Sequence, residues 1–150
     1  GSVVYFTFWN TSTPPNIIDV PRDGDCLYHA VATAVSSHST IITGQNDGRF
    51  LRKRLGDYIK DNYPKYISKY GHNCLSEITN RVNTQGIWGE SEEIELLSDM
   101  LKSCITVQTL YGLQTFQPEV GQVNGISSEC HSALQLVNMD NKHFAAYARM

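Results

Sequence analysis

The chain has 150 residues, a 41% share of hydrophobic residues and a formal net charge of −3 at pH 7, which together indicate one globular domain with a single core. Its 12 Lys and Arg residues are scattered, and this argues against a nucleic-acid partner, because phosphate recognition needs clustered positive charge. No apolar run approaches the ~20 residues that cross a bilayer, and no signal-peptide pattern is visible, so we expect no membrane contact.

The chain begins with Gly1-Ser2, which resembles the remnant of an expression tag. We expect residues 1–150 to form a single domain. Residues 3–9, VVYFTFW, are β-branched and aromatic and predict a strand. The Pro14-Pro15 pair ends this strand, and residues 17–20 then lead into an acidic turn at residues 23–25.

A helix is predicted to start near Cys26, within the stretch PRDGDCLYHAVATAV at residues 21–35. Apolar side chains recur there at the spacing of one helix face, at positions 27, 30, 31, 34 and 35. Asp23 or Asp25 can cap this helix, because a short carboxylate accepts hydrogen bonds from the N–H groups of a first turn.

Further along, helical patterns cover residues 50–59, 66–70 and 91–101, and the basic cluster at residues 52–54 is expected on a solvated helix face. Strand-type runs follow at residues 104–111, 133–137 and 143–147, the last of them returning as a hairpin strand. Residues 112–132 lack strong periodicity and predict a hairpin or a long loop. Helices first and strands later indicate an α+β fold, with a small, mostly antiparallel sheet packed between helices.

Cys26 is the candidate nucleophile. Backbone N–H groups at a helix N-terminus stabilise a thiolate and lower a cysteine pKa that otherwise lies near ~8.5, and Gly24 allows the preceding turn to approach a substrate and hold an oxyanion. The alternative is that Cys26 is a small apolar core residue. The four cysteines, at 26, 74, 104 and 130, have no C-x-x-C spacing and are few for a disulfide scaffold, which favours a reducing, cytoplasmic compartment.

A thiol nucleophile needs a base, and the chain offers five histidines. His143 ranks first because it begins a strand directly after a polar turn, where a side chain is held rigidly and is accessible. His29 lies in the same predicted helix as Cys26, and the other three, at 38, 72 and 131, lie in polar or weakly patterned segments.

Three segments resemble the ovarian-tumour (OTU) cysteine proteases. Residues 23–28, DGDCLY, are similar to the family's D-G-[DN]-C-x-[FY] nucleophile motif. Residues 88–97, WGESEEIELL, followed by ITV at 105–107, resemble its W-G-x-x-x-E-L helix and following strand, and His143-Phe144 resembles its H-[WYF] element. The three segments occur in the family's order and span residues 21–147, most of the chain.

The resemblance implies a papain-like fold and a deubiquitinase that hydrolyses isopeptide or peptide bonds after the C-terminal Gly-Gly of ubiquitin or a ubiquitin-like modifier. Cys26 would be the nucleophile and His143 the general base and acid, while the backbone of Asp23, Gly24 and Cys26 would form the oxyanion hole. The thiolate–imidazolium pair would need neither a metal ion nor an organic cofactor. We expect a monomer that acts on the modifier and its conjugates, in the cytoplasm of its own cell or, for a viral or bacterial effector, of a host.

The third member of the site departs from the family's pattern. The family often has Asp or Asn two residues after the histidine to orient its ring, and here that residue is Ala145. Asp23 is the first candidate for an orienting or turn-fixing role. Asn138, Asp140 and Asn141 lie just upstream of the histidine and are further candidates, with ordinary turn residues and a Cys–His dyad as the alternatives.

Trp88 is a candidate wall of the channel that would admit a Gly-Gly tail, with core packing as the alternative. The strand at residues 3–9 would extend the modifier-binding surface or cover an edge of the sheet. Two other functions stay open: a modifier-binding module that has lost catalysis, and a papain-like hydrolase of another acyl substrate.

Overall fold

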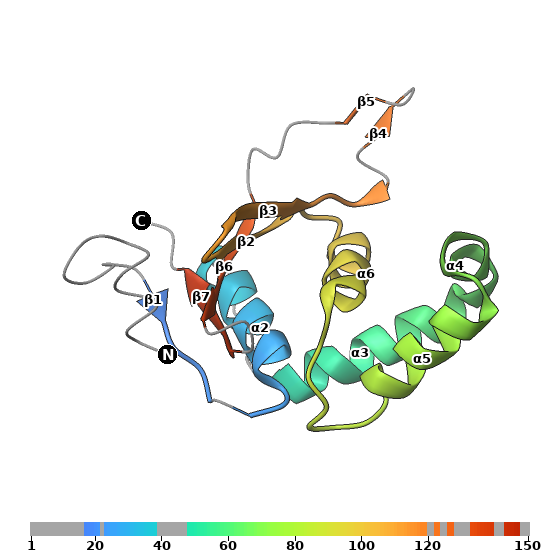
Figure 1. Cartoon of the computed structure of the whole chain (residues 1–150), viewed down its shortest axis with the longest axis horizontal. Helices are drawn as coiled ribbons and strands as arrows, with labels where there is room; N and C mark the ends of the chain where they lie inside the picture. Colours follow the sequence, from blue (N-terminus) through green and yellow to red (C-terminus); the bar gives the residue numbers. More distant parts are fainter. Residues whose placement is uncertain are drawn as a thin grey trace.

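The computed structural model describes residues 17–21, 23–38, 48–119, 122–123, 126–127, 133–139 and 143–147 (Figure 1). Its helices are α2 (Cys26–His38), α3 (Gly48–Asp61), α4 (Tyr63–Tyr70), α5 (His72–Val82) and α6 (Ser91–Leu101). Its strands are β1 (Ile17–Ile18), β2 (Ile105–Thr109), β3 (Gly112–Phe116), β4 (Gln122–Val123), β5 (Ile126–Ser127), β6 (Leu134–Met139) and β7 (His143–Tyr147). The strand predicted for residues 3–9 lies outside the described residues.

The helices begin where the local sequence favours them. α2 starts at Cys26, as predicted. α4 carries Pro64 in its first turn, where the missing N–H has no helical partner in any case. At the start of α6, Glu93 accepts the N–H of Glu90 over 3.0 Å, which is one half of a capping box. α5 is an addition to the predicted helices, and its buried side chains recur at helical spacing: Leu75, Ile78 and Val82.

Five strands form one sheet in the order β1-β7-β6-β2-β3, and β4 and β5 pair separately. β2 and β6 are parallel, whereas the other neighbours in the five-stranded sheet are antiparallel. This confirms the predicted small, mostly antiparallel sheet. β3 forms a hairpin with β2, so the start of the weakly patterned segment at residues 112–132 is a hairpin strand.

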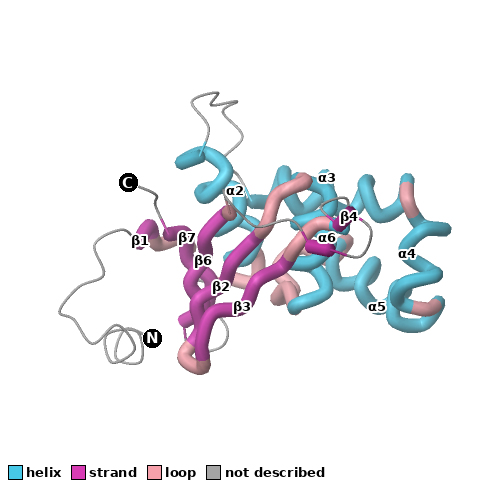
Figure 2. Tube along the Cα trace, turned by 90° about the horizontal axis from the view of Figure 1, so that it is seen from above, coloured by secondary structure: helices cyan, strands magenta, loops and turns pink. Residues whose placement is uncertain are grey.

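The core lies between the sheet and the helices. α2 contacts β6 and β7 on one side and α3 on the other, and Figure 2 shows the sheet on one side of the molecule with α3, α4 and α5 on the other. Because α2 is enclosed from both sides, apolar residues are buried around most of the helix. The opposite face of the sheet carries a smaller apolar cluster of Ile17, Val137, Met139 and Ala145.

Two side chains differ from the sequence-based expectations. Arg52, expected on a solvated face, is 3% exposed, whereas its neighbours Lys53 and Arg54 are exposed. Cys104 is disulfide-bonded, while Cys26 and Cys74 form no disulfide. Of the described helices, none combines the length and apolar character needed to cross a bilayer.

Candidate active site

The candidate site lies at one edge of the five-stranded sheet. His143 begins β7, and β7 runs antiparallel to both β1 and β6, so the ends of β1 and β6 meet the start of β7 at this edge. Cys26, the first residue of α2, is held there as well, because the Phe144 N–H donates a hydrogen bond to its Sγ over 3.5 Å. The predicted nucleophile therefore lies beside the start of the strand that carries the predicted base.

The Cys26 side chain is fully buried. Burial raises the pKa of this thiol above its ordinary value, and the negative charge of Asp23 acts in the same direction. The backbone N–H groups of Phe144, Leu27 and Cys26 itself act in the opposite direction, since they stabilise a thiolate. The helix N-terminus therefore acts to lower the pKa of Cys26 as expected, but burial has the larger effect and the net pKa is raised.

The His143 ring is also buried, with its side chain 4% exposed. Its Nε2 lies 2.6 Å from Oδ1 of Asp19, the residue that follows β1. Its Nδ1 is buried and has no hydrogen-bond partner among the described residues. The ring thus has one nitrogen on a carboxylate and the other left for a further contact, which is the arrangement that a base in a thiol site requires.

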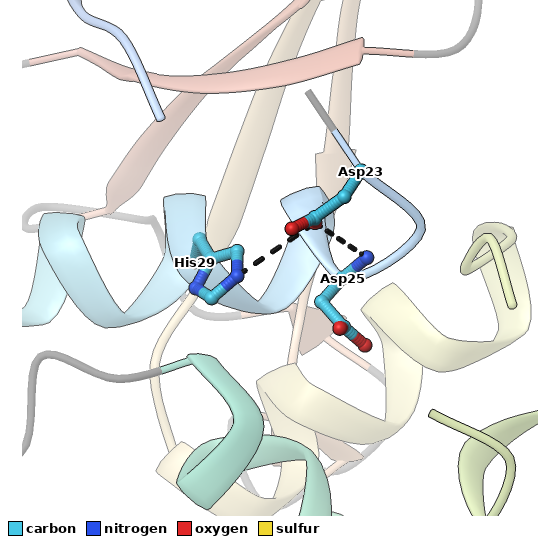
Figure 3. A group of neighbouring side chains, drawn as sticks. All are labelled: Asp23, Asp25 and His29. Atoms are coloured by element: carbon cyan, nitrogen blue, oxygen red, sulfur yellow. Dashed lines mark hydrogen bonds and ion pairs between the residues drawn. The ribbon is translucent and has the colours of Figure 1, made fainter. Parts of the chain in front are cut away.

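Asp23 lies in the turn before α2 and fixes its shape (Figure 3). Its Oδ1 accepts the Asp25 N–H over 2.9 Å and lies 3.7 Å from Nε2 of His29. These are the contacts of a turn-fixing residue. Within the described residues, Asp23 makes no hydrogen bond or ion pair with His143.

Asp23, Asp25 and His29 also bring three ligand-type atoms within 4.8 Å of one another. The Gly48 N–H donates to Nδ1 of His29 over 3.1 Å, so the neutral ring carries its proton on Nε2, the atom that faces Asp23. Asp25 in turn pairs with Arg52 at 2.6 Å. The Arg52 cation on Asp25 disfavours a second cation beside it, so we do not assign this group to a metal ion.

The turn before α2 is packed against a second turn near Gly86. A Cβ on Gly24 would lie 1.6 Å from the Gly86 carbonyl oxygen, so any side chain at position 24 would force the two turns apart. The Asp25 carboxylate accepts the Gly86 N–H over 3.1 Å. Arg52 donates both to this carboxylate and, over 2.7 Å, to the carbonyl of Ile87, and so ties the two turns together.

Of the predicted oxyanion donors, the Cys26 N–H already has a partner: it donates to the Asp23 carbonyl oxygen over 3.1 Å. A substrate oxygen at this position would replace that carbonyl or share the N–H with it. The backbone of Gly24 lies in the same turn, where its carbonyl accepts a bond of 3.4 Å from Arg52.

A cavity of about 390 Å³ leads away from Phe144, the residue in contact with Cys26. It passes between the sheet and the start of α6, and Trp88, 41% exposed, forms part of its wall. The lining residues are Trp88, Gly89, Glu90, Ser91 and Ile94 on one side and Val107, Gln114, Asn138 and Phe144 on the other.

The other candidates for the third residue take different places. Asn138 lies opposite Phe144 in the sheet and lines the cavity, where its buried Oδ1 has no hydrogen-bond partner in the described part of the chain. Ala145 is fully buried on β7. Asp140 and Asn141 lie outside the described residues.

Asp19 was missed by sequence reasoning, although its carboxylate contacts His143. No local pattern marks it, because the contact depends on the pairing of β1 with β7, two segments at opposite ends of the chain. The available signal was its position at the end of a short apolar run, directly before the acidic turn.

Comparison with known proteins agrees with this geometry. Residues 21–144 match the family described as OTU-like cysteine protease. The fold is similar to the OTU domain of OTUD1, at 23% identity over 87% of this chain and 83% of that one, with a TM-score of 0.61. It is also similar to the Hazara virus OTU, at 21% identity, 87% and 78% coverage and a TM-score of 0.61. The OTU domain protease of Dera Ghazi Khan virus has 19% identity, 89% and 80% coverage and a TM-score of 0.63.

At these identities the solved structures establish the fold, and the comparison with curated proteins found no match. The match to the family covers the candidate nucleophile, the Trp-Gly wall and the candidate base in one continuous segment. The chain belongs to the family of OTU-like cysteine proteases.

Proposed function

We propose that the chain is a deubiquitinase, a thiol protease that cleaves isopeptide and peptide bonds after the C-terminal Gly-Gly of ubiquitin or a ubiquitin-like modifier. The observation that supports this most directly is the position of Cys26 Sγ, 3.5 Å from the N–H of the residue after His143. Family membership supplies the reaction class. The Hazara virus OTU and a Wolbachia pipientis OTU deubiquitinase are each bound to ubiquitin in their solved structures.

In the proposed mechanism, Nδ1 of His143 accepts the thiol proton of Cys26. Nε2 is on Asp19 and Nδ1 is buried without a partner in the described residues, so Nδ1 is the ring atom left to serve the thiol. The thiolate attacks the carbonyl carbon of the modifier's terminal glycine, and an electron pair moves onto the carbonyl oxygen. Backbone N–H groups of the turn at residues 23–26 stabilise this oxyanion.

Collapse of the tetrahedral intermediate breaks the C–N bond, and the imidazolium of His143 gives its proton to the leaving lysine amine. The product is a thioester between Cys26 and the terminal glycine. The neutral imidazole then removes a proton from a water molecule as its oxygen attacks the thioester. Release of the carboxylic acid regenerates Cys26 and His143.

The cavity between residues 88–91 and the sheet is the proposed path of the modifier's tail. Gly89 lies against the start of α2, where a Cβ would be 2.5 Å from Cδ2 of Leu27. Trp88 presents a partly exposed aromatic side chain on the same wall. A passage bounded by a flat ring favours glycine over residues with side chains, because a larger residue would clash.

Covalent capture tests the proposal. The chain is incubated with ubiquitin that carries a C-terminal thiol-reactive electrophile, and adducts are measured by intact mass. The wild type and a Cys74→Ala variant should form a one-to-one adduct, and Cys26→Ala should form none; Cys74 is the matched control because it, too, is outside any disulfide. Binding without an adduct would indicate a modifier-binding module. No interaction would overturn the assignment of ubiquitin and favour another acyl substrate.

A further inference from the structure

We propose that Asp19 is the positioning residue for the His143 ring and that, because Asp19 follows β1, full activity requires β1 to be docked on β7. The inference rests on the proposed function for its reaction, whereas its geometry stands on the contacts of this sheet edge. In effect, the neighbouring strand supplies the carboxylate that the family often carries at the position of Ala145.

The pairing of β1 with β7 places Asp19 beside the site. Ile18 lies opposite Ala146 in an antiparallel register, so one further step along β1 brings Asp19 opposite Ala145. Paired residues point to the same face of a sheet, and so do alternate residues of one strand. Asp19, Ala145 and His143 therefore share one face, and the carboxylate reaches Nε2 diagonally across the two strands.

The residue at position 145 is small, whereas a larger side chain there would compete with Asp19 for the space beside the His143 ring. Ala145 is fully buried, and its methyl group leaves the space beside the ring to Asp19. A carboxylate at position 145 would approach His143 along β7, whereas Asp19 approaches from β1. Both carboxylates together would place two negative charges side by side, which is unfavourable.

The contact also selects the tautomer that the reaction needs. Oδ1 of Asp19 lies 2.6 Å from Nε2 of His143, a distance typical of a charge-assisted hydrogen bond. The same oxygen accepts the Val20 N–H over 2.9 Å, so the carboxylate is held from two sides. An ionised carboxylate only accepts, so Nε2 must carry the proton, and in the neutral ring Nδ1 is then the acceptor for the thiol proton.

Because Asp19 follows β1, the orientation of the His143 ring depends on a very short strand. β1 contributes two paired residues at the edge of the sheet. Ile17 packs against the apolar cluster on the second face, whereas Ile18 is 37% exposed. A ligand or chain segment that competed for the edge of β7 would withdraw Asp19 and leave Cys26 and His143 as a dyad.

Moving the carboxylate from one strand to the other tests the inference. Asp19→Ala should lower kcat for a C-terminal ubiquitin amide at least about tenfold, or ~1.4 kcal/mol, with KM within about twofold, since the proposed role of Asp19 is to orient the His143 ring and not to bind the modifier. Asp19→Ala with Ala145→Asp should recover several-fold over Asp19→Ala alone. Ala145→Asp alone should be slower than the wild type. A wild-type kcat for Asp19→Ala, or a folded double variant that recovers nothing, would overturn the proposal.

A second test does not depend on a buried aspartate being tolerated. Ile17→Ala loosens β1 and should lower kcat in the chain that has Asp19, yet it should have little further effect in Asp19→Ala, because Ile17 acts through Asp19. Ile18→Ala, at the exposed neighbour, is the matched control. If the decreases in kcat caused by Ile17→Ala and Asp19→Ala simply add, Ile17 acts through general stability, and this would contradict the proposed coupling of β1 to the site.

Alkylation of Cys26 by iodoacetamide separates this inference from the proposed function, because it needs no ubiquitin. In a Cys74→Ala background, Asp19→Ala should slow the alkylation of Cys26 severalfold. If this holds while the wild type forms no ubiquitin adduct, the proposed substrate is wrong and the positioning role stands. Equal alkylation rates alongside a normal adduct would overturn the positioning role alone.

Discussion

The thiol of Cys26 is surrounded by groups that act on its charge in opposite directions. Burial raises its pKa, three backbone N–H groups favour the thiolate, and burial dominates. A nucleophile in this state is mostly a neutral thiol near pH 7 unless a base takes its proton. In the proposed mechanism, His143 and not the helix N-terminus therefore brings about most of the ionisation of Cys26.

Replacing His143 with alanine should slow the alkylation of Cys26 near neutral pH and move its pH dependence upward. Without the imidazole, the thiolate forms only as the pH approaches the raised pKa of the thiol, so the rate stays low below that pKa and increases with pH. Iodoacetamide alkylation from about pH 6 to about pH 10, localised to Cys26 by peptide mass and compared in a Cys74→Ala background, measures this. Half-maximal reactivity of the variant below ~8.5, the ordinary cysteine pKa, would contradict it.

At the scale of elements, one side chain of α3 joins the loops of the site. The Arg52 guanidinium lies 4.6 Å from the centre of the Tyr28 ring and is almost fully buried. Its donors reach the end of α5, the turn before α2 and the turn before Trp88; the acceptors are Val82, Arg81, Gly24, Asp25 and Ile87. The planar fork of an arginine can satisfy acceptors in several directions at once, so Arg52 fixes the turn at residues 23–26 and the turn before Trp88 relative to one another.

Arg52→Lys should destabilise the fold by about 3 kcal/mol, at the low end of the range for breaking a buried charged network, and should lower turnover at least about tenfold. Lysine keeps the charge but offers a single nitrogen, so several buried carbonyl groups lose their donor. Urea unfolding and ubiquitin-amide hydrolysis measure the two effects. The matched control is Arg54→Lys, exposed on the same helix, which should stay within about 0.5 kcal/mol. Equal unfolding midpoints for the two variants would show that Arg52 does not hold the two turns together.

Local patterns predicted the elements whose contacts are local. The helix from Cys26 and the strand from His143 were predicted because periodicity and turn residues mark them. The strand β3 stayed ambiguous because it is an edge strand with little burial, and its residues show weak alternation. Asp19 and Arg52 could not be assigned, because their roles depend on partners that only the tertiary fold brings near. For both, the sequence offered a charged residue with no indication of its partner.

At the scale of the whole molecule, the cavity is built from three distant parts of the chain. Residues 88–94 form one wall, β2 and β3 contribute to the other, and β6 and β7 close the end nearest Cys26. A cavity built from separate segments allows catalysis and substrate selection to depend on different residues. In the proposed function, the chemistry depends on His143 at the start of β7, whereas the selection of the tail depends on the wall that begins at Trp88.

Trp88→Ala should therefore change selectivity more than chemistry. Removing the ring widens the passage, so kcat/KM for a ubiquitin amide that ends in alanine should increase relative to that for the normal glycine substrate. The Gly-to-Ala ratio of kcat/KM should fall by about tenfold, in the range expected for one methyl group in a fitted pocket. Phe50→Ala is the matched control, because Phe50 is 44% exposed, close to the 41% of Trp88, and lies on α3 outside the cavity lining. The Phe50→Ala ratio should equal that of the wild type. If Trp88→Ala also leaves the ratio unchanged, the tail does not pass Trp88, and the side chain serves packing instead.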